Sequence, residues 1–141
     1  MPKIEQALDK YSFQKRTEKA KISVEEIENK INFSLPEDYK FYATNYSGNE
    51  NFIGNEYVEL WDINQLLELN NEYGITKCLK NTIGIGGNGN SEFIGIELLE
   101  SNEYRMVLSP FIDLNKKYNI EIGNSFTDFF ERLEDGRKWF E

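Results

Sequence analysis

The pattern of apolar residues along this 141-residue chain predicts an α+β fold built on one sheet of mostly antiparallel strands. Helical spacing prevails in the first half, alternation of apolar and polar residues follows over three successive segments, and a last helical pattern closes the chain. Strands that follow one another directly favour antiparallel pairing over the βαβ arrangement of nucleotide-binding folds. No repeat or low-complexity linker interrupts the chain, so we expect a single domain over residues 1–141.

The first 50 residues carry the start and stop signals of three helices. An apolar stripe predicts a first helix over residues 2–11. Ser23 and Glu26 have the spacing of a capping box, so a second helix is expected to begin at Ser23. Pro36 suits the first position of a third helix, and Gly48 suits the glycine that follows its C-cap.

A hairpin and a fourth helix are expected next. Residues 51–60 read as two short strands that turn at residues 54–55. Asp62 is expected to cap the following helix through its side chain, with Gln65 as the reciprocal partner. Gly74 has the position of a C-terminal glycine, so this helix should end there.

The second half of the chain changes to strand periodicity. Three β-segments are expected in succession, over residues 78–86, 91–99 and 103–109. A shorter strand is expected within residues 116–123. Ser125 and Asp128 then mark the start of a final helix, which Gly136 ends.

The letters GIGGNG at residues 84–89 match the dinucleotide-binding pattern G-x-G-x-x-G. That pattern binds a nucleotide only where a helix follows the glycines, because the helix N-terminus holds the pyrophosphate. A strand-like segment follows here. We therefore interpret the glycines as a tight turn between two strands, in which Gly and Asn supply positive φ angles.

Histidine is absent from the chain, which excludes Ser-His-Asp and Cys-His catalysis and the common zinc sites. Catalysis would have to use carboxylates, Lys, Tyr or a hard metal ion bound by carboxylates. Acid pairs such as Glu56 with Glu59 and Glu97 with Glu100 are expected by chance among 25 acidic residues. We therefore expect no enzyme, no metal and no cofactor, with a carboxylate-dependent enzyme as the least favoured alternative.

The net charge of −9 is distributed unevenly. Residues 1–40 hold eight acids and eight bases, whereas residues 41–76 hold six acids and no base. Such a surface repels phosphate backbones, so we expect no nucleic-acid partner and instead a basic protein. The alternative is a solvated acidic face that only favours solubility. Trp61 lies among these acids and is equally consistent with a core residue and with an anchor for a partner.

The sequence lacks the patterns of membrane insertion and export. No apolar run approaches the roughly 18 residues that a membrane helix needs, and the charged start of the chain lacks the apolar stretch of a signal peptide. We therefore expect a cytoplasmic protein with no membrane partner. Cys78 is the one cysteine, which excludes an internal disulfide, and its place in a predicted strand favours a small buried thiol.

Three segments, taken in order, resemble the SUKH superfamily, the Smi/Knr-like group. The first is the capped helix followed by a Leu-Pro-x-x-Tyr helix and a Ser-Gly end, carried here by Ser23, Glu26, Leu35, Pro36, Tyr39, Ser47 and Gly48. The second is the strand–turn–strand segment with Gly86 and Gly89, and the third is the closing helix. The resemblance covers about residues 22–134. It implies an α+β fold with a mixed, mostly antiparallel sheet flanked by helices, and no catalytic site.

Bacterial members of this group are mostly immunity proteins of polymorphic and contact-dependent toxin systems, and they bind a cognate toxin that is often a nuclease or deaminase. Eukaryotic members regulate cell-wall synthesis through protein interactions. The resemblance therefore predicts a non-catalytic protein that neutralises a cognate, basic toxin by stoichiometric binding. A regulatory or scaffold module that binds an endogenous protein is the alternative. The acidic stretch and the central turn supply the expected contacts: Glu56, Glu59, Trp61, Asp62, Glu68, Glu72, Asn88 and Asn90.

Overall fold

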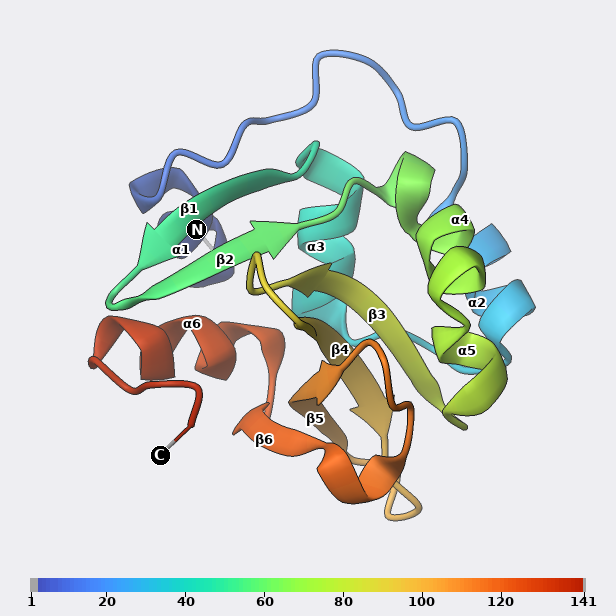
Figure 1. Ribbon diagram of the computed structural model, residues 1–141. Coiled ribbons are helices and arrows are strands. Elements are labelled where there is room, and N and C mark those ends of the chain that lie inside the picture. Colours follow the sequence, from blue (N-terminus) through green and yellow to red (C-terminus); the bar gives the residue numbers. More distant parts are fainter. Residues whose placement is uncertain (1–2, 141) are drawn as a thin grey trace.

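The structure is a computed structural model that describes residues 3–140, and it combines six α-helices with a six-stranded sheet in that part of the chain (Figure 1). The first half contains α1 (Lys3–Lys10), α2 (Val24–Ile31), α3 (Glu37–Asn45), β1 (Asn49–Ile53), β2 (Glu56–Leu60), α4 (Ile63–Tyr73) and α5 (Ile75–Cys78). The second half contains β3 (Thr82–Gly87), β4 (Glu92–Leu98), β5 (Tyr104–Pro110), the 3₁₀ helix η1 (Lys116–Tyr118), β6 (Ile120–Gly123) and α6 (Phe126–Glu134). Pro2, the first residue of the predicted N-terminal helix, lies outside the described residues.

The sheet is a meander in which each strand pairs with the next one in sequence, in the order β1-β2-β3-β4-β5-β6. All five pairs are antiparallel, which confirms the predicted α+β class. β2 and β3 pair over a short stretch, with Glu59 opposite Gly87 and Leu60 opposite Gly86. α4 and α5 are inserted in the chain between these two strands and pack on β3, all six residues of which are buried.

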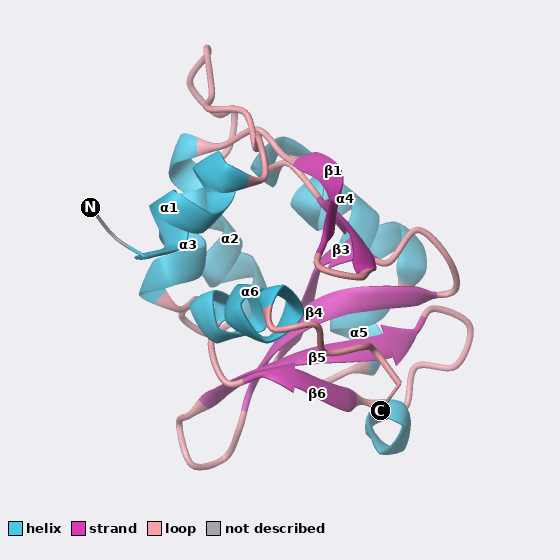
Figure 2. Cartoon of the chain, turned by 90° about the vertical axis from the view of Figure 1, so that its left-hand side faces the viewer, coloured by secondary structure: helices cyan, strands magenta, loops and turns pink. Residues whose placement is uncertain are grey.

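Helices cover both faces of the sheet (Figure 2). α6 packs on β6 and β1 and contacts α1 and α3, whereas α4 and α5 pack on β3 from the opposite face. The core on the α6 side is aromatic: Tyr39 and Tyr42 of α3 meet Phe126 of α6, with ring centroids 5.3 and 5.7 Å apart, and all three are fully buried. Buried aromatic surface of this size is the main stabilising contribution of this layer.

The capping box at Ser23 and Glu26 is confirmed, since both of its hydrogen bonds are present. Helix α3 helps to cap helix α6. The Asp38 carboxylate of α3 accepts hydrogen bonds from the backbone N–H and the hydroxyl of Thr127, at 2.8 and 2.9 Å. Thr127 lies in the first turn of α6, where a carboxylate satisfies free N–H groups and the helix dipole. The segment that follows Leu35-Pro36 thus fixes the angle between α3 and α6.

Two predicted helix ends were wrong by one or more residues. Pro36 is the N-cap of α3, with an extended ψ of 148°, rather than its first helical residue. α3 ends at Asn45 with Tyr46 as an extended C-cap, so Gly48 lies beyond the helix. Gly48 has φ +87° and approaches the Leu60 carbonyl so closely that an added Cβ would lie 2.9 Å from that oxygen. Its role is therefore the close entry of the chain into β1 beside β2.

The prediction of a buried Cys78 in a strand was also wrong. Cys78 ends the short helix α5 and is exposed, and the strand begins only at Thr82. Ile75 and Leu79 are both buried and stand four residues apart, so the apolar spacing here is that of one helical turn. Nearer the C-terminus, the segment predicted as a strand over residues 116–123 splits into η1 and β6.

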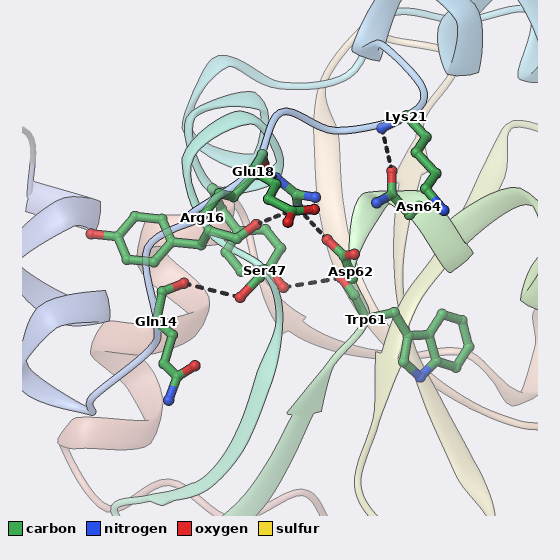
Figure 3. Close-up of polar contacts among 10 residues, drawn as sticks. Gln14, Arg16, Glu18, Lys21, Ser47, Trp61, Asp62 and Asn64 are labelled. Carbon is green, nitrogen blue, oxygen red and sulfur yellow. Dashed lines mark hydrogen bonds and ion pairs between the residues drawn. The ribbon is translucent and has the colours of Figure 1, made fainter.

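Residues 11–22 form a connector, the N-terminal strap, that arches over the start of β1 and the end of β2 (Figure 1). Polar contacts hold the first half of this strap against the segments that precede β1 and α4. The Ser47 N–H donates to the Gln14 carbonyl at 3.0 Å, and the Arg16 guanidinium forms an ion pair with Asp62 (Figure 3). The side chains of this pair are only 10% and 21% exposed, so the contact is partly shielded from water.

Candidate partner-binding site

The outer face of the β1–β2 hairpin carries acids and aromatic rings. Glu50 stands opposite Glu59 and Phe52 stands opposite Tyr57, and because side chains alternate along a strand these four share one face. The other face carries Ile53, Val58 and Leu60, which are buried in the core. Phe52 is 61% exposed, an unusual position for a large apolar ring.

A groove runs beside this face and consists of two adjoining hollows that share Glu59, Trp61 and Gln65. The first, of about 450 Å³, is also lined by Tyr73 and Phe111 and by the turn after β3. The second, of about 300 Å³, extends to Glu50, Asp62 and the residues before β1. We call the two together the aromatic–acidic groove. No Lys or Arg is among the residues that line either hollow within the described part of the chain.

Three aromatic rings form the wall of the first hollow. Trp61 and Tyr73 stack with centroids 6.2 Å apart and planes 11° apart, and Tyr73 lies 4.3 Å from Phe111. Phe93 supports Phe111 from β4, at 5.6 Å. Trp61 is only 7% exposed, whereas Tyr73 is 44% exposed. Trp61 is therefore mainly a core residue, and it contributes its remaining surface to the groove.

The backbone of Trp61 is fixed from two sides. Its N–H donates to the Ile85 carbonyl at 2.9 Å, which extends the short β2–β3 pairing by one bond. Its carbonyl accepts a hydrogen bond from the Tyr42 hydroxyl at 3.0 Å. Burial raises the pKa of Tyr42, so this hydroxyl stays protonated and remains a donor. The indole then points away from the neighbouring Asp62 side chain (Figure 3).

Asn70 of α4 completes the open edge of β3. Its side-chain oxygen accepts from the Gly84 N–H at 2.7 Å, and its amide nitrogen donates to the carbonyls of Gly84 and Leu66, both at 2.8 Å. Asn70 is 1% exposed, so these bonds satisfy backbone groups that have no access to water. This residue was missed at the sequence level, because an Asn within a helix gives no sign of its partner.

Gly87 and Gly89 of GIGGNG line the first hollow, whereas Gly84 and Gly86 allow close packing against neighbouring elements. A Cβ at Gly86 would lie 2.0 Å from the Glu59 carbonyl oxygen, and a Cβ at Gly84 would lie 2.7 Å from Ile75. Gly89 has φ +75°, and its backbone packs against the ring of Tyr57. The prediction of a turn between two strands is confirmed, because β3 ends at Gly87 and β4 begins at Glu92. A strand follows the turn, so no helix N-terminus faces these glycines.

The eight residues predicted as contacts divide into three groups. Glu59, Trp61 and Asn90 line the first hollow. Glu68 and Glu72 are exposed on α4, three and seven residues after Gln65, and so border the groove. The other three make internal contacts: Glu56 with the Trp139 N–H at 2.6 Å, Asp62 with Arg16, and Asn88 with Glu92. Of these three, Asp62 also lines the second hollow.

Asp62 corrects one further expectation. It is the N-cap residue of α4, but its side chain makes no capping hydrogen bond, and the reciprocal pairing with Gln65 is absent. The carboxylate turns instead to Arg16, which also donates to the Tyr46 carbonyl at 3.2 Å. A full ion pair with a partly buried guanidinium is a stronger interaction than a single cap bond at an exposed helix start.

Glu97 anchors the segment that carries Phe111. Its carboxylate, 4% exposed, receives Arg105 at 2.6 Å and Lys116 at 3.0 Å. Burial opposes ionisation, but the hydrogen bonds from these two cations outweigh it and hold the pKa of Glu97 below its usual value. Lys116 lies five residues after Phe111, so this cluster fixes the loop behind the aromatic wall.

A larger hollow, of about 770 Å³, lies between the N-terminal strap and α2. Its charges are balanced, with three acids and three bases in the lining: Glu18, Glu25, Glu26, Arg16, Lys19 and Lys21. It therefore offers no single sign of charge to a partner, in contrast to the aromatic–acidic groove. Between residues 3 and 140, no three His, Cys, Asp or Glu side chains gather as a metal site requires, and no helix has the length and apolar character needed to cross a bilayer.

The meander sheet, with an aromatic helix layer on one face and α4–α5 on the other, defines an α+β protein with the Smi/Knr-like arrangement. The chain belongs to the SMI1/KNR4 family (SUKH-1), whose family model matches residues 20–132. The match includes every residue of the aromatic–acidic groove, and α1 precedes it. A search among curated proteins found no match. Family membership supports binding to a protein partner in general.

Proposed function

We propose that this protein is a non-catalytic immunity protein that neutralises a cognate bacterial toxin by direct, stoichiometric binding. One observation carries the proposal: a groove walled by Trp61, Tyr73 and Phe111 and edged by Glu59 has no lysine or arginine in its lining. Aromatic side chains around a concave centre, with charge at the rim, are the usual composition of strong protein-binding sites.

The sign of the charge suggests the kind of toxin. A nuclease or nucleic-acid deaminase presents a basic surface to the phosphates of its substrate. An acidic inhibitor with a net charge of −9 is attracted to such a surface and can cover it. We expect Glu59, Trp61 and Asn90 to make direct contacts, with Glu68 and Glu72 accelerating association from the border of the groove.

The remaining chemistry also favours binding over catalysis. The chain has no histidine, and Glu97, the most buried carboxylate within residues 3–140, is neutralised by two cations. A catalytic acid or base would need a carboxylate with a raised pKa in a cleft, whereas the pKa of Glu97 is lowered. We propose that the protein acts in the cytoplasm of the cell that makes it, where an incoming toxin would be met.

Co-expression with a toxin domain encoded by a neighbouring gene tests this function. The expected result is survival of cells that carry both genes and a 1:1 complex by calorimetry. Capture of an endogenous housekeeping protein instead, with no protection against the neighbouring toxin, would contradict the proposal and support a regulatory module.

A further inference from the structure

The two hollows of the aromatic–acidic groove offer different chemistry to one occupant. The first presents aromatic surface mainly from Tyr73 and Phe111, with Trp61 stacked behind Tyr73 and only 7% exposed. The second presents the carboxylates of Glu50 and Glu59, which stand opposite each other on β1 and β2. Because the hollows share Glu59 and Trp61, a single side chain can contact both surfaces.

These two carboxylates are not neutralised by a base, although Glu50 accepts a hydrogen bond from the Tyr57 hydroxyl. Among the described residues, neither Glu50 nor Glu59 forms an ion pair with a lysine or arginine. Asp62, in the same hollow, is already neutralised by Arg16. Two adjacent, uncompensated carboxylates repel each other, and a cation placed between them relieves that repulsion.

We propose, on the basis of the protein-binding function above, that the groove receives an arginine side chain of the partner. Its guanidinium plane would stack on the aromatic wall, and its N–H groups would donate to Glu59 and Glu50. A guanidinium is planar, weakly hydrated and forked, so it satisfies an aromatic face and a carboxylate at the same time. Its aliphatic stem would lie along Leu69 and Tyr73, which line the same hollow.

Other occupants satisfy only part of the site. An apolar side chain would cover the rings but would desolvate Glu59 without compensating its charge. A phosphate or other anion would meet two carboxylates and no base. A lysine ammonium could pair with the carboxylates, but it is a compact point charge that makes less use of a flat aromatic wall.

An NMR titration tests this assignment without the toxin. The ¹⁵N-labelled protein is titrated at low ionic strength with N-acetyl-arginine methylamide, and separately with the citrulline analogue, which has nearly the same shape but no charge. Arginine is expected to shift the Trp61 indole and the Gly87 and Gly89 amides in a saturable manner, whereas citrulline leaves them unchanged. Equal shifts with both compounds, or saturable shifts confined to other surfaces, would overturn the assignment. A third titration uses N-acetyl-lysine methylamide, and an affinity equal to that of the arginine compound would overturn the choice of arginine.

Matched variants connect the shifts to the groove. Glu59→Gln removes one charge at nearly constant shape and should weaken arginine binding about five- to tenfold, the loss expected for one charge-assisted contact. Glu103→Gln, an exposed acid in the β4–β5 turn, should leave it unchanged. Equal binding by both variants would contradict the role of Glu59. If the protein binds the toxin but not arginine, only this inference is contradicted. If it binds arginine but does not protect against the toxin, only the proposed function is contradicted.

Discussion

The Tyr42 hydroxyl donates a hydrogen bond of 3.0 Å to the backbone carbonyl of Trp61 and so ties the inner face of helix α3 to the wall of the groove. Tyr42 lies fully inside the core, among the aromatic rings of α3 and α6. Trp61 follows β2 directly and begins the passage into α4. The position of the groove is therefore set by the same aromatic layer that stabilises the fold.

Replacing Tyr42 by Phe should destabilise the protein by about 1–2 kcal/mol, because the buried Trp61 carbonyl loses its donor. Urea unfolding gives the value. Tyr39→Phe is the matched control, since the Tyr39 hydroxyl is buried and has no partner among the described residues. Its removal should be neutral or slightly stabilising. A larger loss for Tyr39→Phe than for Tyr42→Phe would refute this account of the core.

Replacing Asn70 by Ala should cost about 3 kcal/mol, because the N–H and the carbonyl of Gly84 would remain buried without partners. The melting temperature and the urea midpoint should both fall. Asn71→Ala removes an exposed amide from the same helix and should change neither by much. Similar losses for the two variants would show that the helix itself, rather than its bonds to β3, is affected.

Replacing Gly86 by Ala should separate β2 from β3, since the new Cβ would overlap the Glu59 carbonyl oxygen. We expect a loss of about 2 kcal/mol or more in stability, together with weaker partner binding. At Gly87 the nearest atom to an added Cβ lies 3.2 Å away, so Gly87→Ala should be milder. The free energies of unfolding of the two variants test this prediction. A larger loss for Gly87→Ala than for Gly86→Ala would contradict the close approach at Gly86.

The pH dependence of stability should reflect Glu97. Its pKa is lower in the folded protein than the ordinary value of 4.5, so its ionised form stabilises the fold above pH 4.5. This contribution is lost as the pH falls through the folded-state pKa. The stability difference between wild type and Glu97→Gln should therefore shrink below pH 4.5, whereas Glu100→Gln should match wild type throughout. A difference that stays constant with pH would exclude this role.

Local signals in the sequence predicted much of the fold. The helix over residues 63–73 was predicted with its observed bounds, because its apolar spacing is regular and Gly74 ends it in the left-handed conformation. Both strands flanking the central turn were predicted, but the first begins at Thr82 rather than at Cys78. The prediction that the Asp62 side chain caps α4 was wrong, because its real partner, Arg16, lies 46 residues earlier and gives no local signal.

The groove itself could be predicted only in part. Glu59 and Trp61 are close in sequence, and an aromatic residue among acids predicted a contact surface there. Tyr73 and Phe111 reach the same hollow from α4 and from the end of β5, and no local pattern connects them. Glu56 was chosen for its charge, but the folded C-terminal segment brings the Trp139 N–H to its carboxylate. Long-range packing of this kind decides which acids of a charged segment remain free.

The rate of association with the cognate toxin tests the central claim most directly. A variant with Glu59, Glu68 and Glu72 all changed to Lys should associate at least tenfold more slowly at low salt and lose most of its salt dependence. A control with Glu100, Glu103 and Glu131 changed to Lys alters the net charge equally, at exposed sites outside the groove lining, and should slow association several-fold less, since only the long-range attraction is weakened. Equal slowing in both variants, or in neither, would contradict binding through the aromatic–acidic groove.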